Sequence, residues 1–111
     1  PPEDTSEEVK TLKATLALLE KGNSLEGFDI LKVKFEKNPT NQQIQLDLAL
    51  QFFAAGKIEQ ALELTFQSLE TAPHWEDGAA KKQILKFFEA LGSNAPLTIQ
   101  ARKRLSSLLF S

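Results

Sequence analysis

The sequence contains no cysteine, no methionine and no tyrosine, and it has a single histidine, His74. Without a thiol the chain has no disulfide, no thiolate nucleophile and no cysteine-held metal. One imidazole excludes a metal site built from several histidines, and the sequence supplies no partner nucleophile or ligand set that would make His74 catalytic. We therefore expect no enzymatic activity, no cofactor and no bound metal.

An excess of one charge, long apolar runs and glycine-rich loops are also missing. Lys plus Arg is 13 and Asp plus Glu is 15, which gives the 111-residue chain a net charge of −2. That balance provides no basic field for nucleic acid, and no apolar run approaches the roughly 18 residues that a membrane span needs. The five glycines are scattered, without a phosphate-binding pattern. The remaining composition is that of one globular domain over residues 1–111.

The sequence does contain a repeat. A shift of 34 residues places apolar residues on apolar residues and glycine on glycine, for example Leu12 on Leu46 and Gly22 on Gly56. This period is that of the tetratricopeptide repeat (TPR), a unit of two antiparallel helices that stacks into a superhelix.

The sequence resembles the TPR motif most between Gln42 and Pro73. In the motif, small residues let the two helices approach, glycine allows the turn and proline stops the second helix. The matching positions are Leu48, Ala49, Phe52, Gly56, Ala61 and Pro73. Gln45 and Thr65 depart from the motif, which usually has aromatic residues there.

The apolar periodicity predicts helices over about 6–21, 25–37, 41–55, 58–71, 77–91 and 97–110. We expect them to form an all-α, TPR-like right-handed superhelix. Its three antiparallel hairpins are predicted over about 6–37, 41–71 and 77–110, and the last is degenerate. Gly27 lies inside the second of these helices, where we expect it to permit close packing on the first.

The first helix of each hairpin in this motif lines a concave groove. The groove positions fall on Leu12, Leu16, Leu19, Gln43, Leu46, Leu50 and Phe53. TPR domains that grip a C-terminal carboxylate need cationic and amide side chains there, so that function is disfavoured. Two interpretations stay open: Leu12, Leu16, Leu46, Leu50 and Phe53 bind a peptide or helix, or another helix covers them.

The last predicted helix combines a basic cluster with an apolar chain end. Its residues of interest are Arg102, Lys103, Arg104, Leu105, Leu108, Leu109 and Phe110. Cations late in a helix suit its dipole, and the leucines could close the core. The apolar end is equally suited to docking on a partner protein. Lys81, Lys82 and Lys86 are interpreted as a solvated helix face.

The chain also resembles, over essentially its whole length, one particular family. The resemblance is carried by Asp77-Gly78-Ala79-Ala80-Lys81-Lys82, Leu85, Phe88, Leu91-Gly92, Arg102-Lys103-Arg104-Leu105 and Leu108-Leu109-Phe110. These residues resemble the C-terminal TPR region of bacterial chaperedoxins, which are thioredoxin-like co-chaperones. Lys81 and Lys82 stand where that family often has arginine.

The resemblance implies a function in protein folding. The family joins an N-terminal thioredoxin-fold domain to this region, holds unfolded clients and passes them to chaperonin and the Hsp70 system, which places the chain in the cytoplasm. We then expect the chain to be a fragment that lacks the thioredoxin part. The family's final helix contacts chaperonin, which here implies Arg102, Arg104, Leu105, Leu108, Leu109 and Phe110. The alternative is a structural repeat that dimerises or orients a neighbouring domain, and homo-oligomerisation stays open.

Overall fold

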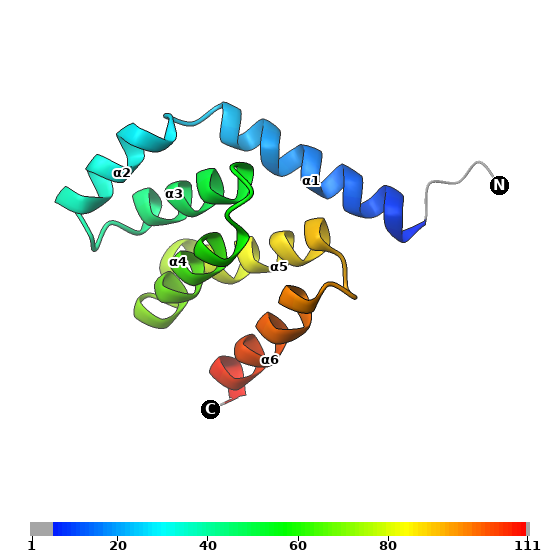
Figure 1. The fold of residues 1–111 in the computed structure, drawn as a ribbon. Coiled ribbons are helices and arrows are strands. Elements are labelled where there is room, and N and C mark those ends of the chain that lie inside the picture. Colours follow the sequence, from blue (N-terminus) through cyan, green and yellow to red (C-terminus); the bar gives the residue numbers. More distant parts are fainter. Residues whose placement is uncertain (1–5, 111) are drawn as a thin grey trace.

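The computed structural model describes residues 6–110, which fold into six α-helices and one 3₁₀ turn without a strand (Figure 1). The elements are α1 (Glu7–Asn23), α2 (Phe28–Lys37), α3 (Gln42–Ala54), α4 (Ile58–Thr71), η1 (Trp75–Asp77), α5 (Ala79–Leu91) and α6 (Pro96–Phe110). The predicted all-α, TPR-like class is thereby confirmed.

Short polar side chains and glycines set several of these boundaries. Ser6 begins α1, where its hydroxyl oxygen accepts a hydrogen bond from the Val9 amide at 3.2 Å. Asn41 begins α3 in the same way, since its Oδ1 accepts from the Ile44 amide at 3.0 Å. After α3, Gly56 has a φ of 81°, a conformation that a side chain disfavours.

The start of α2 differs from the prediction. The helix begins at Phe28, and Gly27 is its N-cap, with extended backbone angles of −65° and 164°. A Cβ built on Gly27 would meet no atom within 4 Å, so this glycine does not mediate helix packing. The predicted range of 25–37 therefore begins three residues too early, and Ser24 closes the end of α1. Local signals placed the break between the two helices correctly but assigned it to the wrong residue.

The middle hairpin, α3 with α4, has the packing expected of the repeat. Ala49 and Ala61 are completely buried between the two helices. Gln45, which replaces an aromatic residue of the motif, reaches across and donates from Nε2 to the Leu64 carbonyl at 2.9 Å. The buried Thr65 hydroxyl donates to the Ala61 carbonyl at 2.8 Å. The polar side chains of both residues that depart from the motif therefore have hydrogen-bond partners.

The first hairpin is open. Figure 1 shows α1 and α2 diverging from their connection, with α2 packed on α3 and α1 packed on α5 and α3. The Thr15 hydroxyl donates to the Ala90 carbonyl of α5 at 3.3 Å. Gln51 of α3 holds the α1–α2 connection, because its Nε2 donates to the carbonyls of Gly22 and Glu26 at 2.7 and 3.0 Å. The prediction of a closed hairpin over 6–37 is thus corrected: α1 pairs with α5.

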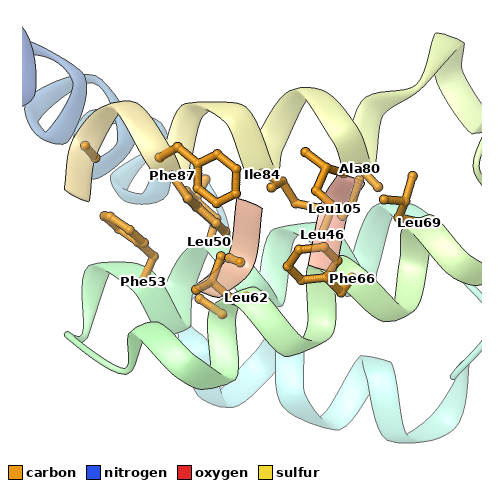
Figure 2. Packing of buried hydrophobic residues seen from close by; sticks show 14 of the residues in the cluster. Leu46, Leu50, Phe53, Leu62, Phe66, Leu69, Ala80, Ile84, Phe87 and Leu105 are labelled. Atoms are coloured by element: carbon orange, nitrogen blue, oxygen red, sulfur yellow. The ribbon is translucent and has the colours of Figure 1, made fainter. Parts of the chain in front are cut away.

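The core lies where α3, α4 and α5 meet, and α1 and α6 close it (Figure 2). Phe53 of α3 stacks on Phe87 of α5 with ring centroids 4.7 Å apart and planes inclined by 7°. Leu18 of α1 and Leu105 of α6 complete the cluster. No helix among residues 6–110 has both the length and the apolar character required to cross a bilayer.

Candidate protein-binding surface

Helix α6 is seated on the core by one narrow face. Pro96 begins the helix, where a missing amide hydrogen costs nothing. Thr98, Ala101 and Leu105 are buried against the rest of the domain, and the helix contacts both α4 and α5. Its other faces remain open to solvent.

Arg104 fixes α6 to α4. Its guanidinium donates to Glu63 with Nη1–Oε1 and Nη2–Oε2 distances of 2.8 and 3.3 Å. It also lies 3.5 Å from a Glu70 carboxylate oxygen and 4.4 Å above the centre of the Phe66 ring. The hydrogen bond from Arg104 holds the pKa of Glu63 below its ordinary value. Arg104 is therefore already engaged within the domain.

The other predicted residues of α6 divide into two groups. Leu105 is buried and Leu108 packs against the core, so the capping interpretation holds for these two. Arg102 is exposed, and the side chains of Leu109 and Phe110 are 44% and 84% exposed. The docking interpretation is compatible with these three, of which Arg102 lies in the middle of the helix and Leu109 and Phe110 at its end.

A cleft of about 640 Å³ borders α6 on its α5 side. Leu85, Phe88 and Leu105 line it together with charged residues. The Arg102 guanidinium lies over the Phe88 ring, 5.8 Å from its centre. The cleft thus offers an apolar surface beside a cation, a combination suited to a protein segment rather than to a reaction. Among residues 6–110, no group of His, Asp and Glu side chains is placed to hold a metal ion.

Comparison with known proteins agrees with the helical architecture. Residues 21–110 match the family described as tetratricopeptide repeat. The chain belongs to the tetratricopeptide repeat family. TPR domains generally mediate protein–protein interactions, so protein binding is the function class to which the family assigns this chain.

One relative of this TPR domain is an uncharacterized protein of Haemophilus influenzae. It is 40% identical over 80 residues, which cover 72% of this chain and 36% of the relative. The chain therefore spans about a third of the relative's length. No solved structure matches the chain.

The concave groove of the TPR motif is not open in this domain. Leu46, Leu50 and Phe53 lie in the buried core beneath α5 (Figure 2). Leu12 and Leu16 remain 59% and 51% exposed on α1. The five residues predicted to line one groove are therefore separated, and the interpretation in which another helix covers the groove holds for the three on α3.

Sequence reasoning missed the cleft beside α6 because it depends on helix placement. In the sequence, Leu85 and Phe88 contribute to the family resemblance, but nothing there places them beside the last helix. The partner across the cleft includes Lys10 of α1, which reaches α5 only because the first hairpin is open. The exposure of Leu85, at 43%, is the structural sign that this face lacks a covering helix.

Proposed function

We propose that this TPR domain is the protein-binding module of a cytoplasmic, thioredoxin-like co-chaperone. It docks on chaperonin through the end of α6 and presents unfolded client proteins to chaperonin and the Hsp70 system. In this proposal the domain contributes binding and no catalysis. The docking residues are Arg102, Leu109 and Phe110, while Arg104, Leu105 and Leu108 hold the helix in place.

The observation that carries this proposal is the exposure of Leu109 and Phe110 at the end of a helix fixed by Arg104. A helix that only closes a core presents polar side chains to solvent on its outer face, whereas this one presents a leucine and a phenylalanine. Phenylalanine is among the residues enriched in protein interfaces. The chaperedoxin-like residues of α5 and α6 supply the expected identity of the partner.

The test is binding of the whole chain to immobilised purified chaperonin by interferometry. A Leu109→Ser, Phe110→Ser double variant should weaken binding about tenfold or more, because it removes two exposed apolar contacts. Ile99→Ser is the control. Ile99 lies on the same helix, and its exposed fraction of 45% is close to the 44% of Leu109. The control should leave the affinity unchanged.

Two outcomes would overturn this function. One is an intact chain that binds neither chaperonin nor a chemically unfolded client at micromolar concentration. The other is an equal loss of affinity in the Ile99→Ser control, which would show that α6 makes only nonspecific apolar contacts with chaperonin. Truncation before Pro96 is a weaker test, because it also removes Ala101 and Leu105 from the core.

A second candidate function is purely structural. Two further apolar pairs are exposed, Leu12 with Leu16 on α1 and Ile30 with Val33 on α2. Contact between such faces would dimerise the chain or orient a neighbouring domain. Sedimentation of the isolated chain separates the two functions: a dimer that disappears in a Leu12→Ser, Leu16→Ser variant favours this one.

A further inference from the structure

A groove with a basic rim runs between α1 and α5. It encloses about 410 Å³, and its apolar floor is formed by Ala14, Ala17 and Leu18 of α1. The charged residues around it are Lys10, Lys13, Lys21, Lys86 and Glu89. The groove exists because α1 packs on α5 instead of on α2, so it could not be anticipated from a regular repeat.

The two helices run antiparallel, which places their lysines on facing edges. The Thr15 hydroxyl bonds to Ala90 near the end of α5, while Lys21 shares an adjoining hollow with Lys82 near its start. Lys10 and Lys21 thus mark the two ends of the α1 edge, and Lys86 lies on the α5 edge between them.

The charge of this groove is opposite to that of the chain. Its lining contains Lys10, Lys21 and Lys86 and a single carboxylate, Glu89, whereas the whole chain carries −2. Within the described residues, Lys10 and Lys86 have no carboxylate partner. A hollow lined by one sign of charge over an apolar floor concentrates the field and attracts segments of the opposite charge.

We propose that this groove binds a short acidic segment of a partner protein, with apolar side chains on its floor and carboxylates against Lys10 and Lys86. The α1 edge from Lys10 to Lys21 is about 16 Å long at the helical rise. That length accommodates roughly five residues of extended chain. The apolar floor favours a peptide over nucleic acid, because Ala14, Ala17 and Leu18 offer no aromatic platform for bases.

This groove adjoins the cleft beside α6, since Lys10 and Glu89 line both, but neither Leu109 nor Phe110 lines it. Its test does not require chaperonin. The probe is a fluorescein-labelled peptide in which Glu-Asp pairs alternate with leucine pairs, followed by fluorescence anisotropy at moderate salt. The control peptide carries Lys-Lys in place of each Glu-Asp pair. The acidic peptide should bind the whole chain, its affinity should fall as salt is raised, and the basic peptide should not bind.

The decisive variant is Lys10→Glu with Lys86→Glu, which reverses one charge on each edge. It should weaken binding of the acidic peptide about tenfold, since each reversal removes one attraction and adds one repulsion. Lys32→Glu with Lys57→Glu is the matched control, because it changes the net charge equally at exposed lysines outside the groove. It should change the affinity less than about twofold.

Four results would overturn the proposal. These are absence of binding by the acidic peptide, equal loss in both double variants, equal binding of the basic peptide, or tighter binding of a single-stranded oligonucleotide than of the acidic peptide. Melting curves by circular dichroism check that each variant is folded, and Lys10→Gln with Lys86→Gln repeats the test without charge reversal. The Leu109→Ser, Phe110→Ser variant should bind the acidic peptide normally, which keeps this proposal distinct from docking by α6.

Discussion

Arg104 and Glu63 are 41 residues apart in the sequence, yet their side chains meet at 2.8 Å and join the last helix to α4. The pair is bidentate, with two hydrogen bonds between the guanidinium and the carboxylate. It is also partly shielded from solvent, because the guanidinium stacks over the Phe66 ring. Such geometry distinguishes it from an isolated surface ion pair. The contact therefore orients α6, and with it the exposed side chains of Leu109 and Phe110.

Acidification should weaken this contact. The hydrogen bond from Arg104 lowers the pKa of Glu63 below its ordinary value of 4.5, so the folded chain binds this proton less readily than the unfolded chain. The resulting stability is fully present above about pH 4.5 and is lost as the pH falls through the lowered pKa. We expect Glu63→Gln to remove this part of the pH dependence, with a stability loss of about 1 kcal/mol or less at neutral pH because the pair is partly exposed.

Urea unfolding of the two proteins across the acidic range measures this effect. Glu59→Gln is the control, since Glu59 is exposed on the same helix and forms no ion pair among the described residues. An acid-induced loss in Glu63→Gln equal to that of the unmodified chain would contradict the assignment to this carboxylate.

Ala61→Phe should overpack the middle hairpin. Ala61 is completely buried where α3 and α4 approach, and a ring inserted there must displace both helices. We expect a loss of about 1–3 kcal/mol or more in the free energy of unfolding. Gln67→Phe, at an exposed position of α4, should have a much smaller effect. An unchanged melting temperature for Ala61→Phe would refute the close approach of the helices.

Local features accounted for most of the helices. The predicted ranges 41–55 and 58–71 correspond to α3 over Gln42–Ala54 and α4 over Ile58–Thr71. This agreement reflects short-range chemistry, because the glycine turn at Gly56 and the stop at Pro73 act on their own neighbours. The same features could not resolve the start of α2, where several cap-forming residues are adjacent.

The partner of each helix was harder to predict than the helix itself. The apolar residues of α1 do not by themselves show which face is buried, because Leu18 enters the core while Leu12 and Leu16 stay exposed. They also do not show which helix covers that face. In the structure Leu18 packs into the core, and α1 pairs with α5 instead of with α2. The same holds for the candidate site. The sequence shows the apolar end of α6 directly, through Leu109 and Phe110. The ion pair of Arg104 with Glu63 could not be predicted, because it depends on tertiary packing.

Thr98→Val should stabilise the domain. The Thr98 hydroxyl is buried and makes no hydrogen bond with the described residues, and an unsatisfied buried polar group costs stability. Valine has nearly the same shape, so we expect a gain of about 1 kcal/mol in urea unfolding. Thr65→Val provides the opposite case, because the buried Thr65 hydroxyl donates to Ala61 and accepts from Gln83. A loss in both variants would show that the Thr98 hydroxyl has a partner in solution.

Phe110→Ala and Phe66→Ala should separate a docking residue from a core residue. Phe66 is 1% exposed in the central cluster, so its truncation should leave a cavity and cost about 3–5 kcal/mol. Phe110 is 84% exposed, and its truncation should change the free energy of unfolding by less than about 0.5 kcal/mol. Thermal and urea unfolding of the two variants measure this contrast. If Phe110→Ala lowers the free energy of unfolding as much as Phe66→Ala does, the Phe110 ring lies inside the domain and is not part of a docking surface. If the variant keeps full stability but binds chaperonin more weakly, the Phe110 ring contacts the partner.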